Sequence, residues 1–208
     1  MNEVYILSAA GTARELAELV RLSPDYRLLG FLDDYAQGDE VAGALSQWPE
    51  LCEGGARLLS ALGSYKNMDR RRDLLSAIPE ERFTAFVHDS VLLYPGADTS
   101  AALVVFPYSI VSTGVRVGNH CLVYHGCVLS HDCRLGEFTI LANNVTVSGQ
   151  VEIGENCYLG ANCTVNENVR IGNNSIIAAG ATVIDDVPED SIYIAPGKKL
   201  PNKYHLSQ

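Results

Sequence analysis

The chain has 208 residues, of which 47% are hydrophobic, and a formal net charge of -10. This charge argues against a nucleic-acid or anionic-membrane partner, because phosphate binding needs clustered Lys and Arg, and we interpret the one basic run, Arg70-Arg71-Arg72, as a solvated helix face. No apolar stretch approaches 18 residues and the start of the chain lacks a basic region, so we expect neither a signal peptide nor a membrane span, and a cytoplasmic protein.

The first 85 residues alternate apolar runs with helical patterns. The predicted strands are 4–7, 27–32 and 58–62, and helices are predicted to follow the first and the third of them. Alternating strands and helices are typical of a small parallel sheet. We therefore predict an α/β domain of Rossmann-like type over residues 1–85.

Ligands of such sheets bind beyond the carboxyl ends of the strands. The turn after the first strand presents backbone N–H groups at a helix N-terminus, which suits a phosphate and makes Gly11 and Thr12 candidates. Asp33 and Asp34 follow the second strand, where an acid commonly bonds a ribose or a base, and we add Lys66 after the third strand. Because the glycine pattern of dinucleotide sites is thin here, a cap without a ligand stays an open alternative.

From residue 105 to residue 183, every sixth residue is Val, Leu or Ile without exception. A helix would repeat its apolar face every 3.6 residues and a strand every two, so a period of six predicts a short flat strand followed by a corner. Three such sides make a triangular coil of 18 residues, and successive coils stack at about 4.8 Å. We therefore predict a parallel β-helix over residues 86–208. The series is Val105, Val111, Val117, Val123, Leu129, Leu135, Leu141, Val147, Ile153, Leu159, Val165, Ile171, Ile177 and Val183.

A second series of smaller residues stands two positions before the aliphatic one. Five of the six cysteines belong to it, namely Cys121, Cys127, Cys133, Cys157 and Cys163. Because their spacing is the period of the fold, we expect packed, reduced thiols in place of disulfides or zinc ligands, in agreement with a reducing compartment. Four aromatic residues point away from the interior and are available to a partner: Tyr108, Tyr124, Phe138 and Tyr158.

The 18-residue coil also predicts which exterior residues are neighbours. It places His131 over Thr113 and under Gly149, about 5 Å from each. The adjacent Asp132 is suited to orient the imidazole and stabilise its charged form, and the Gly149 N–H is suited to an oxyanion. Since no loop interrupts the repeat, we expect the substrate contacts to come from the prism surface, the N-terminal domain or another subunit, which favours a site between subunits.

Two other histidines allow different interpretations. His125 occupies the same class of corner on the preceding side, over Asn143, and is either a substrate contact or simply exposed. His120 and His125 also suggest zinc held between subunits, as triangular β-helices can do. His88 is 32 residues from His120, which is not a multiple of 18, so the geometry disfavours this alternative and we expect no metal.

The N-terminal part ending in Phe31-Leu32-Asp33-Asp34, the hexapeptide region and the segment from His125 to Phe138 resemble the bacterial nucleotide-sugar acetyltransferases. This family includes sialic acid O-acetyltransferases and N-acetyltransferases of nucleotide-linked 4-amino sugars. The resemblance implies an N-terminal domain that binds the sugar nucleotide and an all-β left-handed parallel β-helix. It also implies a homotrimer in which acetyl-CoA lies between two β-helices, and a role in O-antigen or other polysaccharide biosynthesis.

The resemblance assigns roles residue by residue. In the family, a His that acts as general base is followed by an acidic residue, and these two match His131 and Asp132. The thioester contact matches Gly149, the pantetheine contacts match Ala161, Ala179 and Gly180, and the terminal loop matches Pro196 and Lys198. One departure is Ile140, which stands where many members carry a second His, so no role of that His applies here.

These observations predict acetyl transfer from acetyl-CoA to the amine of a nucleotide-linked 4-amino-deoxy sugar, with His131 as base. Two alternatives stay open: O-acetylation of a sugar of the sialic acid type, and a non-catalytic protein that binds a nucleotide sugar.

Overall fold

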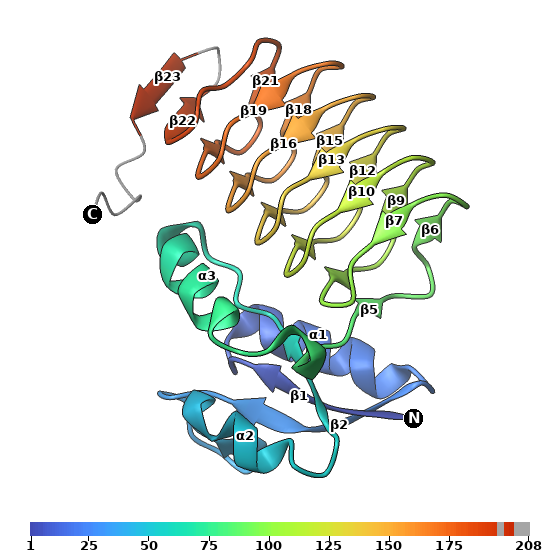
Figure 1. The fold of residues 1–208 in the computed structure, drawn as a ribbon, viewed down its shortest axis with the longest axis vertical. Coiled ribbons are helices and arrows are strands. Elements are labelled where there is room, and N and C mark those ends of the chain that lie inside the picture. Colours follow the sequence, from blue (N-terminus) through green and yellow to red (C-terminus); the bar gives the residue numbers. More distant parts are fainter. Residues whose placement is uncertain (195–197, 202–208) are drawn as a thin grey trace.

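The structure, a computed structural model, describes residues 1–194 and 198–201 (Figure 1). The N-terminal part holds a parallel sheet in the order β3-β2-β1-β4, with its helices following the strands. Its elements are β1 (Asn2–Leu7), α1 (Gly11–Leu22), β2 (Tyr26–Leu32), β3 (Val41–Gly43), α2 (Trp48–Leu51), β4 (Arg57–Ser60) and α3 (Met68–Ser76), with 3-10 turns at Leu45–Gln47, Tyr65–Asn67 and Glu80–Arg82. Within the described residues, no helix is both long and apolar enough to cross a membrane.

The rest of the described chain is a parallel β-helix with three sheets of two-residue strands. Each of these two-residue strands pairs in parallel with the strand 18 residues away, as the period of six predicts. The first sheet, which we call the docked face, contains β5 (Phe86–Val87), β8 (Val104–Val105), β11 (Leu122–Val123), β14 (Ile140–Leu141), β17 (Tyr158–Leu159) and β20 (Ile176–Ile177), extended by β22 (Ser191–Ile194) and β23 (Lys198–Pro201).

The other two sheets complete the triangle. The open face contains β6 (Leu92–Leu93), β9 (Ile110–Val111), β12 (Val128–Leu129), β15 (Thr146–Val147), β18 (Thr164–Val165) and β21 (Thr182–Val183). The charged face contains β7 (Asp98–Thr99), β10 (Arg116–Val117), β13 (Arg134–Leu135), β16 (Glu152–Ile153) and β19 (Arg170–Ile171).

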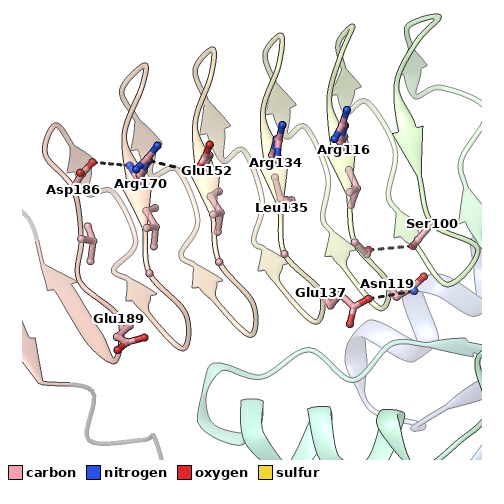
Figure 2. A pocket seen from close by; sticks show the side chains of 18 of the residues that line it. Ser100, Arg116, Asn119, Arg134, Leu135, Glu137, Glu152, Arg170, Asp186 and Glu189 are labelled. Atoms are coloured by element: carbon pink, nitrogen blue, oxygen red, sulfur yellow. Dashed lines mark hydrogen bonds and ion pairs between the residues drawn. The ribbon is translucent and has the colours of Figure 1, made fainter.

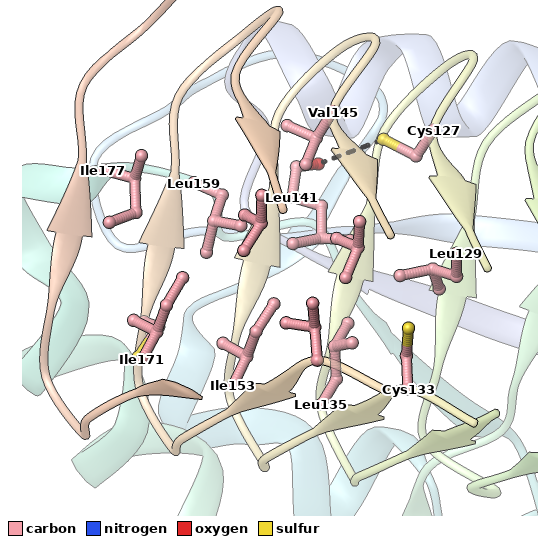
Figure 3. Packing of buried hydrophobic residues seen from close by; sticks show 14 of the residues in the cluster. Cys127, Leu129, Cys133, Leu135, Leu141, Val145, Ile153, Leu159, Ile171 and Ile177 are labelled. Carbon is pink, nitrogen blue, oxygen red and sulfur yellow. Dashed lines mark hydrogen bonds between the residues drawn. The ribbon is translucent and has the colours of Figure 1, made fainter. Parts of the chain in front are cut away.

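The predicted aliphatic ladder fills the prism interior (Figure 3). Leu129, Leu141 and Leu159 are fully buried, and the smaller series packs beside them. Polar members of that series bind corner carbonyls: Ser109 Oγ donates to Tyr124 O at 2.9 Å and Thr139 Oγ1 to Gly154 O at 2.9 Å. The polar side chains of this series are therefore hydrogen-bonded inside the prism, and the backbone groups of the strands pair with those of the neighbouring coils.

The corners require unusual backbone conformations. Asn144, Asn162 and Asn174 adopt left-handed φ angles of 55° to 58°, which asparagine tolerates better than most residues. Gly136 has a different reason, because a Cβ there would lie 2.5 Å from the backbone carbon of Gly154 in the next coil. Asparagines in the left-handed conformation and a glycine at a close backbone approach therefore shape these corners of the prism.

The N-terminal domain packs on the docked face through a second core. Ala13 and Leu16 of α1 cluster there with Phe106, Leu122 and Ile140. Thr12 Oγ1 and Tyr124 Oη are 2.9 Å apart, so a hydrogen bond adds direction to the apolar contact. Ile140 is fully buried in this core, because it lies on the outer side of the docked face and the N-terminal domain covers it.

The four aromatic residues predicted to be available to a partner differ in their surroundings. Tyr124 and Tyr158 pack against the N-terminal core of the same chain, and Phe138 is 8% exposed. Tyr108 is 76% exposed. Three of the four are therefore covered within the chain itself. The predicted boundary at residue 85 stays a prediction, and β5 is the first strand that pairs with the β-helix.

Candidate functional site

His131 and Asp132 form a hydrogen-bonded pair at the corner between the open face and the charged face. His131 Nδ1 lies 2.9 Å from Asp132 Oδ2, and both side chains are more than half exposed. The corner is held to its neighbours by backbone bonds: Asp132 N donates to Thr113 O at 3.1 Å, and Gln150 N donates to His131 O at 3.0 Å. When Nδ1 donates its proton to the carboxylate, Nε2 keeps its lone pair and can accept a proton.

Gly149 lies against the imidazole, as the coil register predicts. A Cβ on Gly149 would be 2.6 Å from both Cε1 and Nε2 of His131, so the ring occupies the space a side chain would need. Within the described part of the chain, the Gly149 N–H has no hydrogen-bond partner. A free N–H next to the basic nitrogen is the arrangement that stabilises a developing oxyanion.

The other predicted cofactor residues lie on a different corner. Ala161, Ala179 and Gly180 follow strands of the docked face and precede strands of the open face. His125 lies at this second corner, with Nδ1 3.4 Å from Asn143 Oδ1 and its ring 4.8 Å from that of Phe106. The two corners are opposite edges of the open face, so a single chain does not bring these residues to His131.

The predicted terminal loop is described in part. Pro196 lies outside the described residues. Lys198 begins β23, which pairs antiparallel with β22 at the end of the docked face. Its assignment to the cofactor stays a prediction.

A pocket of about 200 Å³ lies beyond the carboxyl ends of the N-terminal strands, where ligands of parallel sheets bind. Asp33 and Asp34 line it, as predicted. Gly11, Thr12 and Lys66 are not among its lining residues: Gly11 and Thr12 border a separate shallow surface, and the Lys66 ammonium lies 5.7 Å from the Tyr65 ring centre. Sequence reasoning did not select the other lining residues, which are Ser8, Tyr35, Leu45, Leu62, Gly63, Ser64, Asn67, Arg70, Arg71 and Leu74.

Asp33 also organises the loops around this pocket. Its Oδ2 accepts from Ala9 N at 2.8 Å, while Oδ1 accepts from Tyr35 N at 2.8 Å and Ala36 N at 2.9 Å. Burial alone would raise the pKa of this carboxyl group, but the three amides outweigh it and the pKa is lowered. Asp33 therefore stays ionised and ties the ends of β1 and β2 together.

Arg71 corrects our interpretation of the basic run as a solvated face. It is 4% exposed and donates from Nη1 to Phe138 O at 2.7 Å and from Nη2 to His120 O. Burial lowers the pKa of the guanidinium to about 10. Three consecutive helical residues span about 200° of the helix surface, which a solvated face can hold, so the run itself does not indicate that its middle residue is buried.

His120 is buried between two aromatic rings. Its ring stacks 5.1 Å from that of Phe138 and meets Phe83 edge-on at 4.6 Å. Burial, and secondly the Arg71 guanidinium, lower its pKa to about 4. Across residues 1–194 and 198–201, no three His, Cys, Asp or Glu side chains converge as a metal site would need.

The charged face carries an open groove that sequence reasoning did not identify (Figure 2). Arg116 and Arg134 stand on adjacent strands there, and Arg170 lies between two acids: its Nε is 3.4 Å from Glu152 Oε2, and its backbone N donates to Asp186 Oδ1 at 2.8 Å. The groove adjoins the His131 corner on one side, but the dyad itself is not part of its lining.

Comparisons with known proteins agree with this geometry. Residues 114–149 and 150–185 match the model of the bacterial transferase hexapeptide family (six repeats). By sequence, none of the curated proteins matches the chain significantly. The family model thus matches part of the region in which every sixth residue is aliphatic.

Solved structures are similar over nearly the whole chain. A structure of PerB from Caulobacter crescentus in complex with CoA and GDP-perosamine has a TM-score of 0.87 and 25% identity, and the match covers 96% of this chain and 98% of that one. The acetyltransferase domain of PglB from Neisseria gonorrhoeae in complex with acetyl coenzyme A has a TM-score of 0.88 and 23% identity. WeeI from Acinetobacter baumannii has a TM-score of 0.81 and 17% identity. Each of these two matches covers 96% of this chain and 100% of the other. The predicted resemblance to bacterial nucleotide-sugar acetyltransferases is confirmed.

Proposed function

We propose that the protein transfers the acetyl group of acetyl-CoA to the amine of a nucleotide-linked 4-amino-deoxy sugar. The observation that supports this most directly is the His131–Asp132 pair, whose Nε2 lies against the Gly149 backbone at an exposed corner of the β-helix. The likeness to PerB, whose structure contains CoA and GDP-perosamine, supports the choice of an amino sugar.

In this reaction, the amine must be neutral to attack, because the ammonium form has no lone pair. His131 Nε2 accepts the proton that the nitrogen loses as the new C–N bond forms. Asp132, which accepts from Nδ1, orients the ring and stabilises its positive charge. The Gly149 N–H stabilises the negative charge on the thioester oxygen, and the tetrahedral intermediate then releases CoA as the thiolate.

We propose that the β-helix is left-handed and that the protein forms a homotrimer. In this trimer, acetyl-CoA lies between two subunits. The predicted cofactor residues lie at two corners, which are opposite edges of the open face. If the open face of one chain packs against a neighbouring chain, the His131 corner of the first chain can meet the corner of the neighbour that carries Ala161 and Ala179. The open face is suited to burial, because Leu92 and Ile184 on it are 52% and 60% exposed.

We propose that the nucleotide binds in the pocket at Asp33 and Asp34. Arg70 and Arg71 border this pocket and supply positive charge for a diphosphate, while Ser64 and Asn67 supply hydrogen-bonding groups. We place the enzyme in the cytoplasm, where acetyl-CoA and nucleotide sugars are made, and in polysaccharide or O-antigen biosynthesis.

The direct test is turnover of His131→Ala with acetyl-CoA and a panel of UDP-, GDP- and dTDP-linked 4-amino sugars. We expect kcat to fall by about 10²-fold or more. His88→Ala is the matched control, because that histidine bonds locally to Ser90 and lies outside the site. Near-normal turnover of His131→Ala would reject the base.

Two further measurements separate the alternatives. Mild alkali hydrolyses an ester but leaves an amide intact, so mass spectrometry of the treated product distinguishes O-acetylation from N-acetylation. Calorimetry distinguishes a non-catalytic binding protein, which would bind the nucleotide sugar and fail to bind acetyl-CoA.

A further inference from the structure

The exterior residues at the His131 corner form two stacked columns with a spacing of 18. One column runs through Thr113, His131 and Gly149, and the other through Gly96, Gly114 and Asp132. The dyad is therefore bordered by a residue without a side chain on each side: Gly149 follows the imidazole, and Gly114 precedes the carboxylate.

Gly114 makes the space that the Asp132 carboxylate occupies. A Cβ on Gly114 would lie 2.4 Å from Asp132 Oδ1 and 3.4 Å from its Cγ. Real Cβ atoms do not approach oxygen so closely, so the carboxylate would have to turn. Its two oxygens belong to one planar group, and turning Oδ1 away also displaces Oδ2, which binds His131 Nδ1 at 2.9 Å.

The backbone conformation alone does not explain a glycine at this position. Gly114 has a φ of 69°, but Asp132, Gln150 and Asn168 occupy the same column with φ angles of 60° to 61° and carry side chains. One coil earlier, Gly96 also has a positive φ, of 87°, yet a Cβ there would meet one atom within 4 Å, the Thr113 hydroxyl oxygen at 3.4 Å. The close approach to a carboxylate is what distinguishes Gly114 from Gly96.

We propose that Gly114 is a positioning residue of the dyad: its missing side chain lets Asp132 hold His131 in the tautomer that leaves Nε2 free. This inference rests on the proposed role of His131 as base. Gly114 itself contacts neither the proposed substrate nor the cofactor, and acts through Asp132.

The test is a double-mutant cycle of Gly114→Ala and Asp132→Ala, with Gly96→Ala as the matched control for a Cβ at a positive φ. We expect Gly114→Ala and Asp132→Ala each to lower kcat by about tenfold or more, with the KM for acetyl-CoA within about twofold. The double variant should be no slower than Asp132→Ala, because the first change acts through the side chain that the second removes. Gly96→Ala should retain the wild-type kcat.

Two readouts do not depend on turnover. The ¹⁵N chemical shifts of the His131 ring report which nitrogen carries the proton, and we expect the Nδ1–H form to lose population in Gly114→Ala and not in Gly96→Ala. If Gly114→Ala lowers the melting temperature by more than Gly96→Ala does, adding Asp132→Ala should reduce the effect of Gly114→Ala to that of Gly96→Ala, since the clashing oxygen is gone and only the strain of a Cβ at positive φ remains.

The outcomes separate this inference from the proposed function. A wild-type protein without acetyltransferase activity would refute the function, while the ring shifts and the melting temperatures would still decide the role of Gly114. An active wild type with Gly114→Ala indistinguishable from Gly96→Ala in kcat and in ring shifts would overturn the inference. Additive losses in the cycle would overturn it as well.

Discussion

Acidification should destabilise the contact between α3 and the β-helix through His120. This ring lies between Phe83 and Phe138, and its pKa is lowered from 6.5 to about 4 by burial first and by the Arg71 guanidinium second. A histidine with a lowered folded-state pKa binds more protons when unfolded. Its contribution to stability is therefore present above pH 6.5 and is lost as the pH falls from 6.5 towards 4.

The size of the effect follows from the two pKa values. The pKa of His120 is 6.5 in the unfolded chain and about 4 in the folded one. By linkage, this difference lowers the free energy of unfolding by about 2 kcal/mol at pH 5 and by about 3 kcal/mol at pH 4. Since maximal stability of a domain is about 5 to 15 kcal/mol, such a loss is readily measured. Carboxyl groups titrate near pH 4, so the comparison is made at pH 5 and above, where the His120 contribution is more easily separated from theirs.

The assay compares wild type with His120→Phe by urea unfolding at pH 7, 6 and 5. Phenylalanine suits this position, because Phe138 has a φ of 62° at the equivalent corner and His120 has 58°. Nδ1 of His120 is buried without a hydrogen-bond partner, so the exchange removes no bond made by that atom. We expect the free energy of unfolding of wild type to fall by about 2 kcal/mol more than that of the variant between pH 7 and pH 5.

The burial of a neutral His120 would be refuted if the free energies of unfolding of wild type and His120→Phe fell in parallel with decreasing pH. If wild type and His120→Phe lose the same free energy of unfolding over this range, within about 0.5 kcal/mol, then His120 is not buried as a neutral ring. The contact between α3 and the corner carbonyls would need another description.

Two further predictions concern the prism interior. Leu141→Ala should lower the free energy of unfolding by about 2 to 5 kcal/mol, because Leu141 is fully buried and the coils above and below it cannot close the cavity. Leu22→Ala is the matched control: this residue is 79% exposed at the end of α1, so its truncation should change the free energy of unfolding by less than about 0.5 kcal/mol in the same urea titration. Burial raises the thiol pKa of Cys127 and Cys157 to about 12. Neither thiol should therefore react with Ellman's reagent at pH 8 until the protein is unfolded. Rapid labelling of the native protein at either site would contradict the packing described above.

The β-helix could be predicted from sequence because its contacts are set by a constant offset. Each interior residue meets residues 6, 12 and 18 positions away, so the period alone fixed the prism, the placement of the cysteines and the neighbours of His131. The stacking of His131 on Gly149 is confirmed for this reason, and the bond between His131 and Asp132 follows from their adjacency in the chain.

The N-terminal pocket could be predicted only in outline. The ends of its strands were visible in the sequence, and this located Asp33 and Asp34. Arg71 was misjudged as solvated and the burial of His120 was not foreseen, because both depend on how α3 packs against corners of the β-helix about 50 to 70 residues away, and no periodicity links the two.

The sequence by itself determined the prism, its interior and the pairing of an imidazole with a carboxylate at one corner, because a regular repeat converts position in the chain into position in space. Only the tertiary structure decided which face α1 and α3 cover, that Arg71 is buried, and that the predicted cofactor positions fall on two separate corners. The reason is that domain packing depends on side-chain shape and burial between segments distant in the chain, which a local pattern does not contain.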